Sequence, residues 1–442
     1  MGELRRHRGS RRARRGWWLW LALPLIATAV APALAQQQIT PLSIYNPPAP
    51  GGDPTAPPPG QSALSESVLL RSQPDYDPPG IHNGGFVIFP KLQIGEKFDD
   101  NIRDTDDNRL SDFGTIVAPS LTAESTWSRH ALGLQAFGVF TTFAEHSSED
   151  SQEGGVNATG RLDITDQDYL SGFLSYSHEV QPRSEPDDTG EKHPSVFDRY
   201  LAEQSYAHRF SRIEVRLDTQ FQRLDYLQNF DNDRDRSDFS IGPRVSYLLS
   251  PSFIPFIQAT YLNQAFDAPV DRSGFDRDDH SFTGLAGVTF DIGPVISGEV
   301  AAGAFHTEFD DPAFDPVTNV AFQGSLTWNV TTLTTITGSL SRQEIVTTET
   351  DNSSALSTRA AVRVDHQLMH NVLIGAGIGY RNDNYQGTSR VDNQFDFLVG
   401  ASYLLNRNAS ISVGYEFTSR DSNIEADDFY DNVVQIGVDL HM

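Results

Sequence analysis

Apolar and polar positions alternate along the chain from Asn371 to Met442, with a period of two residues. The apolar positions of the first three runs are Val372, Ile374, Ala376, Ile378 and Tyr380, then Phe395, Phe397, Val399, Ala401, Tyr403 and Leu405, and then Ile411, Val413, Tyr415 and Phe417. Successive side chains of a β-strand point to opposite faces of the sheet, so this pattern predicts strands with one apolar face. Soluble β-sandwiches and membrane β-barrels both contain such strands.

The length of the runs and the asymmetry of the turns favour a membrane barrel. Each run has ten residues or more, whereas strands of soluble proteins average about five or six residues. A strand that crosses a membrane needs about 9–11 residues. Short turns also alternate with long polar loops, as they do in outer-membrane barrels. The sequence therefore predicts an all-β fold, a transmembrane antiparallel up-and-down β-barrel.

The same alternation predicts about 18 strands, within a range of 16–18, between residues 84 and 442. An even number of strands places both ends of a bacterial barrel in the periplasm. The predicted strands are 84–98, 111–126, 130–145, 153–164, 168–181, 198–210, 212–227, 237–249, 252–266, 279–291, 294–308, 318–329, 332–346, 355–368, 371–382, 391–405, 408–420 and 430–442.

The connections between the predicted strands are of two kinds. One kind is short, such as Ser250-Pro251 and Met369-His370, and the other is long and acidic, such as 99–110 and 421–429. Because the N-terminus is expected in the periplasm, the short turns are expected there too, and the long acidic loops are expected outside the cell. Most of the excess negative charge then belongs to one end of the molecule.

The N-terminal 35 residues have the three parts of a secretory signal peptide. Seven arginines precede an apolar segment from Trp17 to Val30, and Ala33-Leu34-Ala35 follows as a cleavage site. Ser10-Arg11-Arg12 has some likeness to a twin-arginine signal, but a barrel must cross the inner membrane unfolded, which favours the general secretory route. Residues 1–35 are therefore predicted to be removed.

Residues 36–83 are predicted to be a Pro/Gly-rich periplasmic tether and lead-in to the barrel at 84–442. Proline and glycine dominate 36–60 and cannot build a packed core at that density. The lead-in from 61 to 83 could dock in the mouth of the barrel, but its composition favours a disordered segment.

Charge and hydropathy exclude several classes of protein. The formal net charge is −26, and it becomes −32 when the seven arginines and Glu3 of the signal peptide are removed. This argues against nucleic acid as a partner, because phosphate binding needs a basic surface. The mean hydropathy is −0.39 and no apolar run reaches the length of a membrane helix. A barrel needs no such run, because only every second strand residue faces lipid.

Charged residues on the strands predict which face lines the lumen. Lysine or arginine facing lipid near the midplane costs about 2–4 kcal/mol, so Val215 and Leu217 are expected to face lipid and Arg216 the lumen. These residues could act as a channel filter, or they could merely pair with one another within the wall. The candidate lumen-lining residues are Arg161, Glu214, Arg216, Glu299, Arg359, Arg363, Asp365 and Glu416.

Aromatic residues recur at the ends of the predicted strands. Aromatic girdles at the membrane interfaces are typical of outer-membrane barrels, so these residues are interpreted as interfacial anchors rather than as ligand-stacking groups. They are Phe98, Trp127, Phe143, Tyr169, Tyr247, Phe290, Trp328 and Tyr403.

Motifs for metal, cofactor or catalytic chemistry are not found. The segment 231–235 resembles half of a calcium loop, but Arg236 stands at the glycine position and Gly242 at the final acidic position. The chain has no cysteine, which excludes disulfides, thiolate metal sites and a cysteine nucleophile. No nucleophile motif is recognisable, so neither an enzyme, nor a cofactor, nor a metal site is expected.

The residues that precede and form the first predicted strand resemble a known family. The opening of the putative β-barrel porin 2 family reads "ydP-G…G-F…P…yDDN", and this chain carries it as Tyr76-Asp77-Pro78, Gly80, Gly85-Phe86, Pro90 and Phe98-Asp99-Asp100-Asn101. Phe98 stands where tyrosine is usual. The resemblance would cover residues 63–442, and it implies an outer-membrane barrel of a kind often associated with exopolysaccharide systems.

Two functional hypotheses follow from the residues and the resemblance. The first is a porin-like channel for passive diffusion of small solutes or saccharides, with acidic outer loops that disfavour anions. The alternative is a closed or plugged barrel that serves exopolysaccharide export or the cell surface. The expected location is the outer membrane. The expected partners are outer-membrane lipid and lipopolysaccharide, the barrel-assembly machinery, export components in the second hypothesis, and further copies in a homotrimer.

Overall fold

The structure is a computed structural model that describes residues 67–69, 71–185, 191–228, 230–347 and 352–442. The predicted signal peptide at 1–35 and the tether from 36 to 66 lie outside the described residues.

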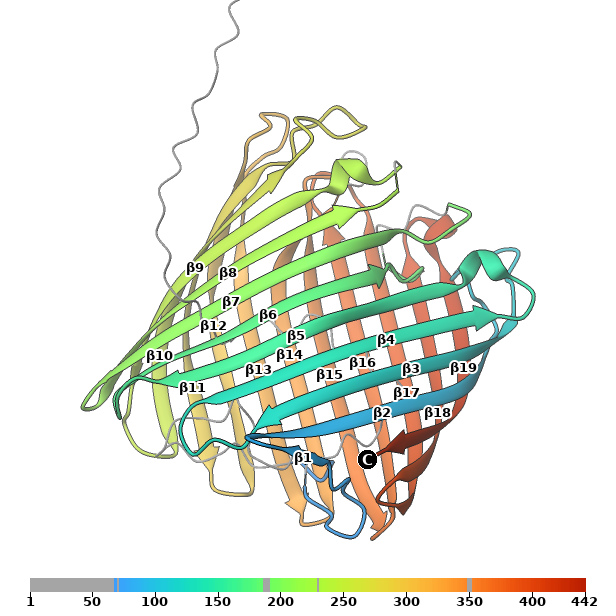
Figure 1. The fold of residues 1–442 in the computed structure, drawn as a ribbon. Coiled ribbons are helices and arrows are strands. Elements are labelled where there is room, and N and C mark those ends of the chain that lie inside the picture. Colours follow the sequence, from blue (N-terminus) through green and yellow to red (C-terminus); the bar gives the residue numbers. More distant parts are fainter. Residues whose placement is uncertain (1–66, 70, 186–190, 229, 348–351) are drawn as a thin grey trace, which may run out of the picture.

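Strands make up most of the described chain (Figure 1). Each predicted strand corresponds to one observed strand, with ends that differ by at most three residues. Apart from the short β1, they have 12 to 16 residues, enough to cross a membrane at a tilt. The strands are β1 (Ile81–Asn83), β2 (Phe86–Asp99), β3 (Asp112–Ser125), β4 (Ala131–Phe143), β5 (Ser151–Asp163), β6 (Asp168–Val180), β7 (Val196–Phe210), β8 (Ile213–Tyr226), β9 (Arg236–Tyr247), β10 (Phe253–Phe266), β11 (Asp279–Ile292), β12 (Ile296–Phe309), β13 (Val317–Thr331), β14 (Thr334–Val346), β15 (Ser354–Met369), β16 (Val372–Tyr385), β17 (Val391–Asn406), β18 (Ala409–Ser422) and β19 (Phe429–His441).

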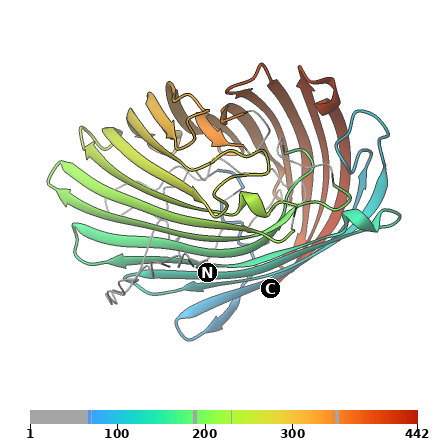
Figure 2. The same cartoon turned by 90° about the horizontal axis from the view of Figure 1, so that it is seen from above.

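The strands from β2 to β19 form one closed barrel. Each strand pairs antiparallel with the next in sequence, and β19 returns to pair with β2 from Val433↔Asp99 to His441↔Lys91. Seen from above, they enclose an oval interior (Figure 2). The predicted antiparallel barrel of 18 strands is thus confirmed. Closure leaves these strands without a free edge, because the first and the last strand satisfy each other.

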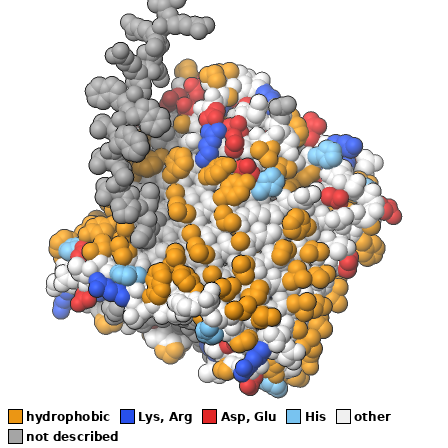
Figure 3. Space-filling view, in the orientation of Figure 1, with side chains coloured by type: hydrophobic (Ala, Val, Ile, Leu, Met, Phe, Trp, Pro, Cys, Tyr) orange, Lys and Arg blue, Asp and Glu red, His pale blue; other side chains and the backbone are white. Residues whose placement is uncertain are grey.

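Burial on the barrel wall is the reverse of that in a soluble protein. On β19, Val434, Ile436 and Val438 are exposed, whereas Gln435 and Asp439, at the alternate positions of the same strand, are buried. The apolar side chains spread over the outer surface (Figure 3). A wall with apolar side chains outside and polar side chains inside suits hydrocarbon around the barrel and water within it.

Long and short connections alternate around the barrel. The longer ones, which define the long-loop rim, include η1 (Ser147–Glu149), η2 (Asn232–Arg234) and η3 (Glu425–Asp427). They are 100–111, 144–150, 181–195, 227–235, 267–278, 310–316, 347–353, 386–390 and 423–428. The shorter ones, which define the turn rim, are 126–130, 164–167, 211–212, 248–252, 293–295, 332–333, 370–371 and 407–408. No helix in the described part of the chain is long and apolar enough to cross a membrane.

The described lead-in, residues 67–69 and 71–80, docks inside the barrel near the turn rim. Val68 is buried and its N–H donates to Thr335 Oγ1 on β14 at 2.9 Å. The expectation of a disordered lead-in is therefore wrong for these residues, and the docking alternative is observed. The reason is that Leu373 and Leu404 point into the barrel, where the lead-in covers them.

Candidate functional site: the barrel lumen

The predicted lumen residues lie on the strand faces opposite to the exposed apolar side chains. Glu214 is buried on β8, next to exposed Val215, and Asp365 is buried on β15, next to exposed Val364. Because neighbouring strand residues point to opposite faces, these carboxylates point inward. The same alternation on their strands places Arg161, Arg216, Glu299, Arg359, Arg363 and Glu416 on the inner face.

Many inward cations pair with an aspartate two residues further along the chain. Arg161 Nε lies 2.9 Å from Asp163, Arg216 Nε lies 3.0 Å from Asp218 and Arg363 Nε lies 2.8 Å from Asp365. Residues i and i+2 share one face of a strand, so the spacing alone brings the charges together. The same spacing recurs in Lys97–Asp99, Arg236–Asp238, Arg381–Asp383 and Arg390–Asp392.

This repeated cation-x-aspartate spacing is a local signal that sequence reasoning missed. It would have identified Arg236 and Arg381 as further members of the inner wall. The pairs show that many charges of the inner wall neutralise one another, as expected if these residues pair within the wall. Whether the paired residues also govern ion selectivity stays a prediction.

One ion pair spans three neighbouring strand junctions. Arg244 on β9 lies 2.7 Å from Glu299 on β12, and its guanidinium stacks 3.4 Å from the centre of the Phe256 ring on β10. Strands β10 and β11 separate the two partners in the sheet. Such a contact is possible only on the concave face, where inward side chains converge, so it places Glu299 in the lumen.

The other predicted residues have weaker anchorage. Glu214 pairs with Arg209 at 3.2 Å, and Arg359 Nε donates to Ser357 Oγ at 3.3 Å. The Glu416 carboxylate makes no hydrogen bond or ion pair with another described residue of the chain.

Two of the predicted interfacial aromatics also belong to the inner wall. Lys97 Nζ lies 4.6 Å above the centre of the buried Phe143 ring, and the Arg161 guanidinium lies 4.5 Å above the ring of Tyr169. The prediction that Phe143 and Tyr169 anchor the barrel in the membrane interface is therefore wrong. Aromatic side chains at strand ends point outward or inward, depending on which of the two alternating sets of strand positions they occupy.

The described first part of the β6–β7 loop, residues 181–185, leaves the long-loop rim and folds into the lumen. Its near end is held by the buried carboxylate of Glu149 in η1, which receives Arg183 Nε at 3.0 Å and Arg103 Nε at 2.9 Å. A carboxylate that accepts several guanidinium N–H groups in a buried place is strongly held. The loop is thereby fixed to its neighbours in the rim.

The next residues of this loop reach the opposite wall. The carbonyl oxygen of Ser184 accepts hydrogen bonds from Arg381 Nη2 on β16 at 3.4 Å and from Arg420 Nη1 on β18 at 3.2 Å. The Glu185 carboxylate lies 3.5 Å from Arg381. Between β7 and β16 the sheet runs through eight further strands, so the loop crosses the lumen. Sequence reasoning missed these residues because no local pattern signals a contact across the barrel.

A cavity of about 830 Å³ lies in the lumen beside this loop. Its lining combines aromatic rings, such as Phe137 and Phe173, with charged groups, such as Lys97 and Glu153. This volume lies within the range of small-molecule sites, about 300–1,000 Å³. The space is therefore sufficient for a small solute.

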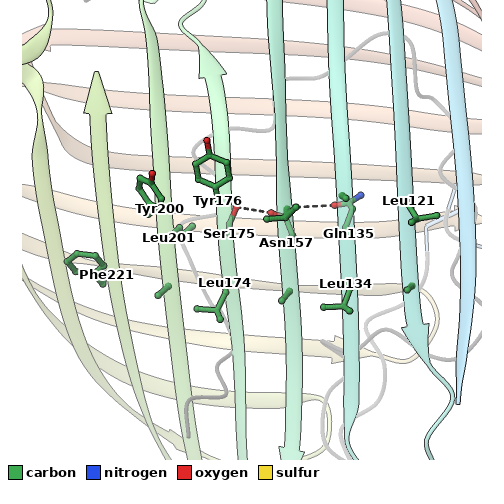
Figure 4. A pocket seen from close by; sticks show the side chains of 15 residues that line it. Leu121, Leu134, Gln135, Asn157, Leu174, Ser175, Tyr176, Tyr200, Leu201 and Phe221 are labelled. Carbon is green, nitrogen blue, oxygen red and sulfur yellow. Dashed lines mark hydrogen bonds between the residues drawn. The ribbon is translucent and has the colours of Figure 1, made fainter. Parts of the chain in front are cut away.

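A second concavity, of about 700 Å³, lies on the outer face of β3 to β8. Leu121, Leu134 and Leu174 border it, and small alanines form its floor (Figure 4). The side chains of Gln135, Asn157 and Ser175 form a chain of hydrogen bonds of 3.1 and 2.7 Å in the same wall. Because exposed apolar side chains border it, this groove belongs to the lipid-facing surface and lies apart from the lumen.

The second half of the family-like opening, Phe98 to Asn101, joins the first strand of the barrel, β2, to the last strand, β19. Asn101 Nδ2 donates to the carbonyl oxygen of Tyr430 at 2.9 Å, and its own N–H donates to Asp99 Oδ1 at 3.0 Å. The Asp100 carboxylate accepts Asn432 N–H at 2.8 Å. These residues therefore join β2 to β19 at the closing seam.

The charge of Asp100 is stabilised at this seam. Burial opposes its ionisation, but the hydrogen bonds from Asn432 and the nearby Arg109 guanidinium outweigh burial and lower the pKa of Asp100 below its usual value. The carboxylate is therefore ionised wherever the seam is formed at neutral pH.

The first half of the opening, Tyr76 to Gly80, belongs to the docked lead-in. Tyr76 packs against Leu373 and Leu404, and Asp77 accepts the N–H of Gln73 at 2.7 Å. Pro78 is buried, and Gly80 has a positive φ of 66°. A side chain at position 80 would meet Val87 Cγ1 at 2.4 Å, so this position requires glycine.

Comparison with solved structures returns outer-membrane proteins of Pseudomonas aeruginosa. OpdK is 12% identical, with a TM-score of 0.44, over 80% of this chain and 99% of its own. OpdO is 13% identical, with a TM-score of 0.44, over 81% of this chain and 97% of its own. The siderophore receptor PirA is 7% identical, with a TM-score of 0.42, over 80% of each chain.

None of the curated proteins matches the chain. The family model described as "Putative beta-barrel porin 2" matches residues 73–442, which include the whole barrel and most of the docked lead-in. This is a family of β-barrel porins rather than of enzymes. The chain therefore belongs to the Putative beta-barrel porin 2 family, and it is a porin-like barrel of the outer membrane.

Proposed function

We propose that this protein is a water-filled channel for the passive diffusion of small solutes or saccharides, and that the β6–β7 loop sets its narrowest part. The observation that carries the proposal is the polar inner wall of a closed barrel with this loop across it. Eighteen strands spaced about 4.8 Å apart and tilted by about 40° give a backbone circle roughly 35 Å across. Barrels of this size leave an aqueous channel unless a segment fills it.

The proposal includes a preference for cations. The long-loop rim would face outside the cell, where its excess carboxylates repel anions. Inside, the arginines are largely matched by their own aspartates, as in Arg216–Asp218 and Arg363–Asp365. Acidic residues outnumber lysine and arginine by 26 in the chain, so the carboxylates in excess of these pairs would make the channel and its rim negative.

The proposal also includes how the chain reaches the outer membrane and which lipids surround it there. A cleaved signal peptide at residues 1–35 would send the chain through the inner membrane, and the assembly machinery would insert the barrel. Outer-membrane lipid and lipopolysaccharide would then surround the apolar outer face seen in Figure 3. Association as a homotrimer remains a prediction from sequence.

Planar-bilayer conductance of the folded protein under a salt gradient tests the proposal. We expect stable conductance steps and a reversal potential of the sign that cation preference gives. Arg223→Ala is the matched control, because Arg223 pairs with Asp267 on the outer face of β8 and its loss should leave the reversal potential unchanged. A folded protein without conductance would contradict the channel and favour the plugged barrel of the export hypothesis.

A further inference from the structure

The lead-in occupies a recess on the inner wall near the turn rim. Leu373 on β16 and Leu404 on β17 form the floor, and they are 0% and 1% exposed because Leu69 and Tyr76 pack against them. Both leucines belong to strand faces whose other inward residues are mostly small or polar. A pair of inward leucines in a wet wall is an apolar surface that needs a cover.

Polar contacts fix the lead-in in this recess. The Val68 N–H donates to Thr335 Oγ1 at 2.9 Å, and Thr335 Oγ1 donates to Asn329 Oδ1 at 2.6 Å. Arg71 Nη1 donates to the carbonyl oxygen of Thr332 in the adjacent turn. These bonds reach β14 and the β13–β14 turn, so the lead-in spans the wall from β14 to β17.

A turn within the lead-in directs Tyr76 back to the wall. The Asp77 carboxylate accepts Ser72 Oγ at 2.6 Å and the Gln73 N–H at 2.7 Å, and the N–H of Tyr76 donates to the carbonyl oxygen of Gln73 at 2.7 Å. The Tyr76 ring then lies 5.9 Å from the ring of His370. The first half of the family-like opening therefore shapes this turn.

We propose that the lead-in, through its described residues 67–69 and 71–80, is an internal plug segment that narrows the mouth of the lumen at the turn rim. A segment packed on a β-sheet forms a layer about 10 Å thick, and here that layer lies within a barrel roughly 35 Å across. The claim that it narrows a solute path rests on the proposed channel function, whereas its docking does not.

Cysteine chemistry tests the docking directly, because the chain contains no cysteine of its own. In the full-length protein in outer-membrane vesicles, Val68→Cys should react with a charged thiol reagent at least about tenfold more slowly than Asp75→Cys at an exposed position of the same segment. The double variant Val68→Cys/Thr335→Cys should form a disulfide, because the hydrogen bond from the Val68 N–H to the Thr335 side chain makes the two residues neighbours. Equal reaction rates and no disulfide would overturn the docking.

Polymer exclusion in planar bilayers tests the narrowing. The variant Leu69→Asn/Tyr76→Ser removes the apolar contacts with the recess, and Asp75→Ser is the matched control in the same segment. We expect the undocked variant to admit larger neutral polymers from the turn-rim side and an unchanged size limit from the long-loop side. Gel mobility before and after heating shows that each variant has folded.

The outcomes separate the plug from the channel. Equal size limits for the undocked variant and the parent protein overturn the plug and leave the channel intact. A silent parent with a conducting undocked variant supports a plug that seals the mouth. Silence of both proteins overturns the channel and the narrowing together, while the cysteine experiments still report on docking.

Discussion

At the long-loop rim, the segment that enters the lumen is held by ion pairs, and at the turn rim the lead-in is held by apolar packing together with a few hydrogen bonds. Glu149 binds Arg183 and Arg103 at the first, and Leu373 and Leu404 pack against Leu69 and Tyr76 at the second. Charged pairs are directional and lose much when one partner is removed, whereas apolar packing is non-directional and tolerates movement. We therefore expect the crossing at the long-loop rim to be more sensitive to the loss of one side chain than the lead-in at the turn rim.

The largest effect is expected from Glu149→Ala at the long-loop rim. The change leaves Arg183 buried without its carboxylate, and breaking a buried pair in this way costs about 3–5 kcal/mol. The β6–β7 loop should leave its place, so single-channel conductance should rise and a protease should cut the loop. Glu145→Ala removes an exposed carboxylate from the same connection and is the control. Unchanged conductance in a protein whose loop is cut would show that the loop does not limit the channel.

The turn rim is best perturbed by Gly80→Ala. At a φ of 66° a side chain is strained, and the new methyl group would also meet Val87 and Phe89. Such strain costs about 1–3 kcal/mol, enough to loosen the lead-in while the barrel stays folded. The reaction rate of Val68→Cys with a thiol reagent should rise in this background. Gly84→Ala is the control, because it shares a positive φ but has open space around it. If Gly80→Ala and Gly84→Ala raise the reaction rate of Val68→Cys equally, the crowding at position 80 is not what keeps the lead-in docked.

Substitutions on the inner wall between the two rims should change the ion selectivity of the channel rather than its conductance. Arg216→Gln and Arg363→Gln remove cations and leave Asp218 and Asp365 unmatched, so the lumen becomes more negative. The reversal potential under a salt gradient should shift toward stronger cation preference. Arg223→Gln, on the outer face, should produce no shift. An unchanged potential in the first two variants would mean that these pairs serve the wall alone.

The smallest effect is expected at the seam. The pKa of Asp100 is lowered in the folded protein, so its ionised form adds stability above the unfolded pKa near 3.9, and this contribution is lost as the pH falls through the folded pKa. Asp100→Asn should lower the melting temperature at pH 7 but not at pH 3. The difference should correspond to less than about 1 kcal/mol, because the pair is partly exposed. Asp106→Asn, in the same connection, should behave like the parent protein. A deficit of equal size at both pH values would point to lost packing instead.

The strands and their order follow from local rules, and so they were predictable. A period of two defines each strand, and hydrocarbon on one side forces arginine and glutamate to the other. Arg216 and Asp365 were therefore assigned to their faces from their neighbours alone. The pairing of Arg216 with Asp218 was equally local, since both residues share a strand face.

The contacts across the lumen were not predictable in this way. Ser184 with Arg381, Arg244 with Glu299 and Val68 with Thr335 join residues that are remote in sequence and separated by intervening strands. They depend on the curvature of the closed sheet, which decides which inward side chains face each other. Phe143 and Tyr169 show the same limit, because parity and closure turn their rings inward. The sequence by itself determined the strands, their order and their faces. Only the tertiary structure decided what enters the lumen, because the groups that hold those segments meet only after the barrel has closed.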